Sequence, residues 1–248
     1  MDAILDIAEK YDLKVIEDAA HALPAKYKGR FVGTIGDLTA FSFYATKNLT
    51  TGEGGMLTGP QESLEEARVW SLHGMSRDAW KRYSSEGSWY YEVVRPGFKY
   101  NMSDIAAAIG IHQLRKLSQF HERRRQIVKR YNEAFSELRE LEIPTEKKDV
   151  EHAWHLYVVR LNLRFLKISR NQFIEELKSR NIGTSVHFIP VHLHPYYRDK
   201  YGYKPDDFPV TFQEYQRIIS LPLYPKMSDQ DVQDVIDAVT EIIHTHRR

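Results

Sequence analysis

The chain has 248 residues, of which 42% are hydrophobic and 28% are charged, and its formal net charge is +1. This length accommodates one large domain or a larger and a smaller one, and the near-neutral charge argues against a nucleic-acid-binding surface. The absence of cysteine excludes disulfide bonds, and no apolar run is long enough to span a membrane. The acidic start, Met1–Asp6, lacks the features of a signal peptide, so we expect a cytoplasmic protein.

The first part of the sequence predicts helices alternating with strands, read from hydrophobic periodicity, cap residues and glycine-rich turns. In chain order we expect a helix containing Ile4, Leu5 and Ala8, strands over 14–16, 38–43 and 55–59, and a helix capped by Ser63 and ended by Gly74. Elements that alternate in this way build a sheet covered by helices on both faces. The fold class predicted for this part is therefore α/β.

Residues 76–95 interrupt the alternation with a loop rich in aromatic side chains. Its aromatic residues are Trp80, Tyr83, Trp89, Tyr90 and Tyr91. Such a loop is interpreted either as a lid over a ligand or as a contact with a second subunit.

The second part of the sequence predicts longer helices and a second domain. In chain order we expect a helix capped by Ser103, a helix over 122–141, a strand over 154–161, a helix from Ser169 through Arg180, a strand over 186–189, and a final helix capped by Ser228. The basic run Arg123–Arg125 is expected to be the solvated start of a helix. We place the domain boundary after residue 120, with residues 1–120 in a larger domain and 121–248 in a smaller α+β domain that begins with a bridging helix.

A single lysine stands out between an aromatic strand and a glycine-rich turn. The predicted strand contains Phe41–Phe43, Lys47 follows it, and Gly52–Gly55 forms the turn. An amine held at a buried strand end loses hydration, which lowers the pKa of a lysine and lets it condense with a carbonyl group. The alternative is an ordinary solvated lysine at a strand end.

A second stretch supplies an acid in a matching position. Asp18 ends the apolar run that begins at Val15, and ligands of open α/β sheets lie at the carboxyl ends of the strands. Pyridoxal 5'-phosphate (PLP) requires a carboxylate beside its pyridine nitrogen and a lysine at its aldehyde. Ser42, just before Lys47, is placed to hydrogen-bond the cofactor phosphate.

Five ordered blocks extend this pattern over nearly the whole chain. They are Glu17-Asp18-Ala19-Ala20-His21, Phe41-Ser42-Phe43 with Lys47-Asn48, Gly52-Glu53-Gly54-Gly55, Gly97-Phe98-Lys99-Tyr100-Asn101-Met102 and Ser220-Leu221-Pro222-Leu223. In this order they resemble the PLP-dependent nucleotide-sugar aminotransferases of the DegT/StrS family. The resemblance implies the fold of the type I PLP-dependent aminotransferases, with a large αβα domain and a smaller α+β domain.

The resemblance also implies roles for individual residues. Lys47 would bind the PLP aldehyde and carry the proton, Asp18 would keep the pyridine nitrogen protonated, and His21 would contact the ring. Ser42 would hold the phosphate, and Asn101 would reach the cofactor phosphate of the partner subunit in a homodimer. The implied reaction transfers an amino group from glutamate to a nucleotide-linked 4-keto sugar in cell-surface polysaccharide or lipopolysaccharide biosynthesis. A dehydrating branch of the family carries histidine in place of this lysine, and Lys47 argues against it.

Further motifs look most like the branch that makes 4-amino-4-deoxy-arabinose on UDP. They are His73-Gly74, Asp78-Ala79, His152-Ala153-Trp154-His155, Ile182-Gly183-Thr184 and Val186-His187-Phe188. His187, His192 and His194 also suggest a metal site, but the chain has no cysteine and no carboxylate cluster near them, so no metal is predicted. We interpret these histidines as residues that fix a loop or contact substrate.

Chains of the family begin well before the position that corresponds to Met1. The resemblance therefore implies that the first strands of the large domain, the phosphate-binding loop and the aromatic residue that stacks on the cofactor have no counterpart in this sequence. A sheet without them would expose apolar strand edges. The alternatives to an active aminotransferase are a catalytically incompetent fragment and a non-enzymatic regulatory relative.

Overall fold

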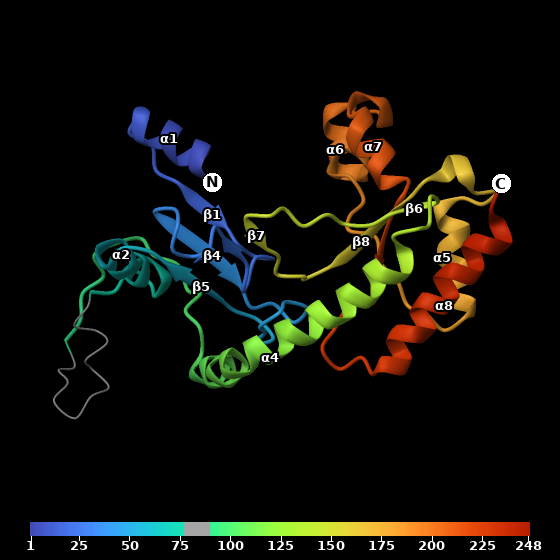
Figure 1. The fold of residues 1–248 in the computed structure, drawn as a ribbon. Helices are drawn as coiled ribbons and strands as arrows, with labels where there is room; N and C mark the ends of the chain where they lie inside the picture. The colour runs from blue at the N-terminus through green and yellow to red at the C-terminus, as the bar shows by residue number, and fades with distance from the viewer. Residues whose placement is uncertain (77–89) are drawn as a thin grey trace. The chain divides into compact units, whose positions relative to one another are not determined.

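A computed structural model describes residues 1–76 and 90–248 of the chain (Figure 1). The chain divides into two compact units: unit 1 comprises Met1–Ser118 and Lys147–Ala153, and unit 2 comprises Gln119–Glu146 and Trp154–Arg248. We had expected one boundary after residue 120. The first division falls two residues earlier, and a short later segment returns to unit 1. No helix in the described ranges combines the length and the apolar character needed to cross a membrane.

Unit 1 is organised on a three-stranded sheet in the order β1-β4-β5. The strands are β1 (Ile16–Asp18), β4 (Leu38–Ser42) and β5 (Gly55–Thr58). Strand β4 pairs in parallel with β1 and antiparallel with β5. The predicted strand over 14–16 is displaced toward the C-terminus, because the Val15 amide donates to the Asp37 carboxylate at 2.9 Å instead of a strand partner.

A second small sheet explains why a later segment belongs to unit 1. Its order is β3-β2-β7, with β2 (Lys26–Tyr27) between β3 (Arg30–Phe31) and β7 (Val150–Glu151). Strand β7 pairs antiparallel with β2, and the Lys28 amide donates to the Asp149 carbonyl oxygen at 2.7 Å. These pairings attach Lys147–Ala153 to unit 1, although the sequence placed this segment in the second domain.

Two helices flank the sheet of unit 1 in the sequence. Helix α1 (Asp2–Lys10) confirms the first predicted helix. Helix α2 (Gln61–Ser71) begins after Pro60, and the predicted cap at Ser63 is wrong because Ser63 already lies in the first helical turn. The chain then turns at Gly74, whose φ of +67° is in the left-handed region, and a Cβ there would lie 1.8 Å from the Arg95 carbonyl oxygen.

Helix α4 (Asp104–Phe135) is one continuous helix of 32 residues, where the sequence predicted two. Ser103 accepts the Ala106 amide at 3.3 Å, as expected of the helix cap. The run Arg123–Arg125 lies inside this helix, so its prediction as a solvated helix start is wrong. Arg124 is only 6% exposed.

Unit 2 contains an antiparallel sheet in the order β6-β8-β9 and several helices. The strands are β6 (Leu141–Glu142), β8 (Tyr157–Leu161) and β9 (Ile218–Leu221), and the helices are α5 (Arg170–Ser179), α6 (Pro195–Tyr201), α7 (Pro209–Tyr215) and α8 (Asp229–His246). The predicted strand over 186–189 is wrong, since only the neighbouring Ser185 pairs, with Ser220, and Pro190 has no amide hydrogen to donate.

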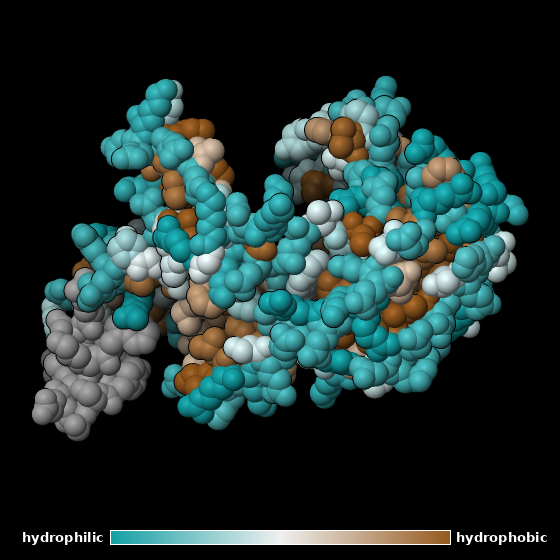
Figure 2. Space-filling model, viewed as in Figure 1, coloured by the Kyte–Doolittle hydropathy of each residue, from teal (hydrophilic) through white to brown (hydrophobic). Residues whose placement is uncertain are grey.

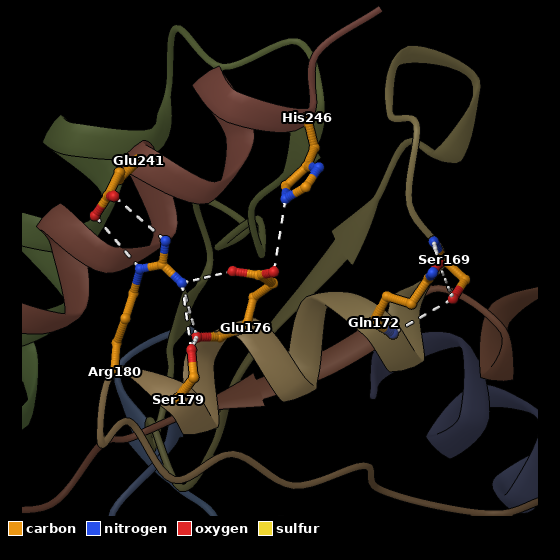
Figure 3. Close-up of polar contacts among 7 residues, drawn as sticks. All are labelled: Ser169, Gln172, Glu176, Ser179, Arg180, Glu241 and His246. Carbon is orange, nitrogen blue, oxygen red and sulfur yellow. Dashed lines mark hydrogen bonds and ion pairs between the residues drawn. The ribbon is translucent and has the colours of Figure 1, made fainter.

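The predicted caps of α5 and α8 are confirmed. Ser169 and Ser228 each form a capping box with the residue three positions later, Gln172 and Asp231. Figure 3 shows the first of these boxes, and beside it Arg180 at the end of α5, which bonds Glu176 on its own helix and Glu241 on α8. These local interactions explain why both helices start where the sequence predicted.

The two units differ in the size of their apolar cores. The core of unit 2 joins the second part of α4 to β8, β9, α5 and α8. In unit 1 the buried cluster contains Phe43, Leu49 and Leu117, with a few partly buried side chains against it. Apolar atoms reach the surface of unit 1 over α1 and β1 (Figure 2), and a shallow cavity of about 310 Å³ there is lined by side chains from Ile4 to Ile16.

Candidate active site

Asp18 is the last residue of β1, and its register partner on the parallel strand β4 is Ala40. Its Oδ1 accepts the Ala20 amide at 3.0 Å, which fixes the carboxylate at the start of the turn that follows the strand. Among the described residues no cation pairs with this exposed carboxylate. Parallel neighbouring strands end at the same sheet edge, so Asp18 and the residues that follow β4 belong to one edge.

Lys47 lies in the turn that follows β4. Its amide donates to the Tyr44 carbonyl oxygen at 2.9 Å, and the turn closes where the Thr51 amide donates to the Phe43 carbonyl oxygen at 2.9 Å. The side chain is half-buried, and its amine makes no hydrogen bond or ion pair with any residue that the structure describes. The amine is therefore available to a ligand at the edge that carries Asp18.

Glycine residues keep this turn compact. Gly54 has φ +151°, and a Cβ at this position would lie 2.4 Å from the Thr51 hydroxyl oxygen. A Cβ at Gly55 would lie 2.6 Å from the Phe41 carbonyl oxygen, across the β4–β5 pair. Larger residues would push the turn outward, so glycine is needed at both positions for the turn to keep this shape.

The remaining predicted residues occupy three different segments of unit 1. Ser42 ends β4, and its hydroxyl oxygen accepts the Tyr44 amide at 3.3 Å, which leaves the hydroxyl hydrogen for another acceptor. His21 is exposed in the turn after β1. Asn101 precedes α4, where its side-chain oxygen accepts the Lys99 amine and its amide donates to the Met102 carbonyl oxygen at 3.4 Å.

The sheet edge offers groups that match PLP. An unpaired carboxylate suits a protonated pyridine nitrogen, an unpaired amine suits an aldehyde, and a hydroxyl with a free hydrogen suits a phosphate. Asp18, Lys47 and Ser42 supply these groups from the ends of β1 and β4. The fit rests on the pairing of the two strands and on the absence of internal partners for the two charges within the described part of the chain.

Sequence reasoning missed several buried polar residues, among them Asn48 and Arg124. Asn48, next to Lys47, is 9% exposed, and its amide donates to the carbonyl oxygens of Leu23 at 2.9 Å and Ala153 at 2.8 Å. Arg124 donates to the carbonyl oxygens of Trp154, His155 and Leu223. The carbonyl oxygens that accept these hydrogen bonds lie far away in the sequence. The sequence signal for such a residue would be a polar side chain at a position where the pattern predicts an apolar one.

The histidines of unit 2 have separate surroundings. His187 Nδ1 lies 2.7 Å from the Ser220 hydroxyl oxygen, and the buried His192 packs against Phe208 with 4.8 Å between ring centroids. His194 precedes α6 as its cap residue. Within residues 1–76 and 90–248 no three histidine, aspartate or glutamate side chains gather as a metal site.

Part of the predicted aromatic loop lies outside the described residues. Trp80, Tyr83, Trp89 and the Asp78-Ala79 pair belong to this part. Tyr90 and Tyr91, at its end, are 54% and 43% exposed.

Comparison with known proteins identifies the chain's relatives. The family model described as the DegT/DnrJ/EryC1/StrS aminotransferase family matches residues 1–240. The chain is 62% identical to an uncharacterised protein of Methanocaldococcus jannaschii over 248 residues, all of this chain and 64% of that protein. It is 56% identical to the spore coat polysaccharide biosynthesis protein SpsC of Bacillus subtilis over 98% of this chain and 63% of SpsC. The chain thus spans less than two thirds of the length of these relatives.

Solved structures agree with this result. The Streptococcus pneumoniae protein Spr1654, in its PLP form, superimposes with a TM-score of 0.83 at 32% identity, over 96% of this chain and 60% of that one. The same protein has been solved in an apo form and a PMP form. The predicted α/β fold of the type I PLP-dependent aminotransferases is confirmed, and PLP is the cofactor of these relatives. The chain belongs to the DegT/DnrJ/EryC1/StrS aminotransferase family of sugar aminotransferases.

Proposed function

We propose that the chain takes part in PLP-dependent transamination of a nucleotide-linked keto sugar, with glutamate as amino donor. The observation that carries the proposal is the edge of the β1–β4 sheet, where Asp18 and Lys47 provide an acid and an amine that make no ion pair with the described residues. Both groups lie at the carboxyl edge of the sheet, where ligands of open α/β sheets bind, and neither is engaged by an internal ion pair that a ligand would have to break.

Each residue of this edge has a defined task in the proposed reaction. PLP, when bound, supplies an electron sink for the carbon that gains or loses a proton. Lys47 would hold the aldehyde of PLP, and its amine would carry a proton between a substrate carbon and the cofactor. The Asp18 carboxylate keeps a proton on the pyridine nitrogen through a charge-assisted hydrogen bond. Ser42 donates its hydroxyl hydrogen to the phosphate, and His21 contacts the ring.

The substrate part of the proposal rests on the relatives and on local motifs. The name of SpsC supports a role in polysaccharide biosynthesis, and we extend it to cell-surface polysaccharide or lipopolysaccharide made in the cytoplasm. The motifs His73-Gly74 and His152-Ala153-Trp154-His155 favour a UDP-4-keto sugar and the branch that forms 4-amino-4-deoxy-arabinose.

The active assembly that we propose is a homodimer with shared sites, in which Asn101 binds the cofactor phosphate of the partner subunit. Mixing inactive Lys47→Ala protein with inactive Asn101→Ala protein should restore activity, since one site of each mixed dimer then holds both original residues. Mixed dimers without activity would show that Asn101 does not act across the interface.

A second candidate is a catalytically incompetent fragment or a non-enzymatic regulatory relative. It is favoured by the exposed apolar side chains over α1 and β1. Amino-group transfer from glutamate to a UDP-4-keto sugar distinguishes the two candidates, because neither an incompetent fragment nor a regulatory relative would catalyse it.

The test is reductive labelling. The chain is mixed with excess PLP, treated with borohydride and digested, and labelled lysines are identified by mass spectrometry. We expect the label on Lys47, loss of the specific label in Lys47→Ala, and an unchanged pattern in the matched control Lys226→Ala, which removes an exposed lysine of unit 2. Labelling spread evenly over exposed lysines would contradict the proposal.

A further inference from the structure

Asn48 connects three segments of unit 1 through one buried side chain. Its amide nitrogen donates to the Leu23 carbonyl oxygen at 2.9 Å and to the Ala153 carbonyl oxygen at 2.8 Å. A carboxamide nitrogen has two hydrogens, and each of them is engaged. The side chain is 9% exposed, so water does not readily replace either bond.

The first acceptor belongs to the turn that follows Asp18. The Ala19 amide donates to the Ala40 carbonyl oxygen at 2.9 Å, which continues the pairing of β1 with β4 beyond the strand end. Leu23 lies in the segment between β1 and β2, and its side chain packs against the cluster of Phe43 and Leu49. A bond to its carbonyl oxygen therefore holds the segment that follows Asp18 and contains His21.

The second acceptor belongs to the segment that returns from unit 2. Ala153 is 3% exposed and follows β7, which pairs with β2. Because β2 begins shortly after Leu23, both acceptors are parts of backbone held by hydrogen bonds of their own. Asn48 thus ties its turn to two anchored segments.

The turn that contains Lys47 makes few other hydrogen bonds away from its base. Its base is closed at Phe43, whose carbonyl oxygen accepts the Thr51 amide and the Thr50 hydroxyl at 3.2 Å. Tyr44 and the two residues after it are exposed. Beside the apolar packing of Leu49, which is 2% exposed, the hydrogen bonds of the side chain directly after Lys47 therefore set where the Lys47 Cα lies relative to the end of β1.

We infer that Asn48 is a positioning residue that holds the Lys47 amine and the Asp18 carboxylate in a fixed relation, an inference that rests on the proposed function of these two residues. The site requires two N–H donors on a short side chain, which asparagine supplies. An aspartate of the same shape would turn a carboxylate toward two carbonyl oxygens, and alanine would leave both acceptors buried without a donor.

The first experiment tests the connection without any cofactor. Hydrogen–deuterium exchange is measured for the 248-residue chain and for Asn48→Asp and Asn48→Ala. We expect exchange to become faster, on the order of tenfold, in three segments together: 20–25, 44–51 and 149–154. A change confined to 44–51 would overturn the inference.

Two control variants separate this effect from a general loss of stability. Leu117→Ala removes a side chain from the same apolar cluster without removing a donor, so it should lower the melting temperature without the joint change in the three segments. Asn162→Asp makes the same chemical change in unit 2, where the side-chain oxygen only accepts from Arg164, and should leave unit 1 unaffected.

The second experiment tests positioning. The rate of borohydride-trapped PLP labelling at Lys47 is measured relative to labelling at Lys226 in the same sample, well below the melting temperature. We expect a fall on the order of tenfold in Asn48→Asp and none in Leu117→Ala. Equal ratios in wild type and Asn48→Asp would overturn the positioning role. If wild-type Lys47 is not labelled in preference to Lys226, the proposed function is wrong. The positioning role is then wrong as well, even if the exchange experiment shows that Asn48 connects the three segments.

Discussion

Unit 1 and unit 2 place their apolar residues in opposite ways. In unit 2 the side chains of Tyr131, Phe135, Tyr157, Phe173 and Ile242 are fully buried in one continuous core. In unit 1 Ile16 is 67% exposed and Ile105 on α4 is 78% exposed. Ile109, one turn further along the same side of α4, is 46% exposed, so the apolar side of this helix is largely exposed in unit 1.

Because of this difference, the residues that stabilise the fold lie mostly in unit 2, whereas the candidate site lies in unit 1. Unit 2 has a large continuous apolar core, whereas unit 1 holds its candidate site through strand pairing and individual hydrogen bonds such as those of Asn48. Substitutions in unit 2 should therefore change the free energy of unfolding, and substitutions at the sheet edge of unit 1 should change chemistry with little effect on folding.

The largest expected effect concerns Asp18. Asp18→Asn keeps the shape of the side chain but removes the charge that holds the pyridine proton, and we expect the transamination rate to fall by about three to four orders of magnitude. The melting temperature should stay unchanged, because the carboxylate makes one hydrogen bond, to the Ala20 amide. Near-normal turnover in the active assembly would identify a different carboxylate.

A pair of alanine substitutions tests the contrast between the cores. Phe173→Ala in unit 2 should lower the free energy of unfolding by about 3–5 kcal/mol, since this side chain is 1% exposed. Ile109→Ala on α4 in unit 1, where the side chain is 46% exposed, should change it by less than about 0.5 kcal/mol. Denaturant titration of both variants at low protein concentration provides the measurement. Comparable losses would show that the exposed face of α4 is covered in solution.

Alkaline pH should destabilise unit 2 through its buried tyrosines. Burial raises the pKa of Tyr131 and of Tyr157 far above the usual value of about 10. The unfolded chain therefore releases these protons first, so the stability they provide is complete below about pH 10 and declines as the pH rises above it. Burial also lowers the pKa of Arg124 to about 10, so the contribution of this residue to stability increases as the pH rises. It opposes the contribution of the tyrosines but comes from one residue, whereas theirs comes from two.

The test of this pH dependence is the slope of the unfolding free energy between pH 9 and pH 11, both in wild type and in Tyr157→Phe. The variant should lose stability less steeply, although removal of the 2.7 Å bond to Asn132 lowers its stability at neutral pH. Identical slopes would show that Tyr157 ionises in the folded protein at its usual pH.

The smallest expected effect compares two serines at helix starts. Ser228→Ala removes the capping box of α8 and should lower the free energy of unfolding by about 1 kcal/mol. Ser63→Ala is the matched control, because Ser63 lies inside α2 and makes no cap bond, so its effect should be near zero. An equal effect of both substitutions would mean that the cap of α8 is not needed once the core has formed.

The features that could be predicted from sequence are those set by neighbouring residues. Ser169 and Ser228 start helices because their side chains bond amides three positions away, and β4 ends before Lys47 where the glycine turn follows. The placement of Asp18 at the end of one strand and of Lys47 after another also follows from local patterns and family resemblance.

The features that could not be predicted depend on distant partners. Arg124 looked like part of a solvated basic run, yet it is buried because carbonyl oxygens from residues 30 and 99 positions later accept its hydrogens. The segment Lys147–Ala153 was assigned to the second domain, because its charged sequence gives no sign of the pairing with β2.

The return of Lys147–Ala153 to unit 1 has a consequence for synthesis on the ribosome. Asn48 and its acceptor Ala153 are 105 positions apart. At a translation rate of about 5–20 residues per second, the acceptor emerges about 5–20 s after the asparagine. During that interval the nascent chain has β1, β4 and the turn of Lys47, but not the strand and carbonyl oxygen that anchor this turn. The candidate site is thus completed late in translation, after the first segment of unit 2 has already been made.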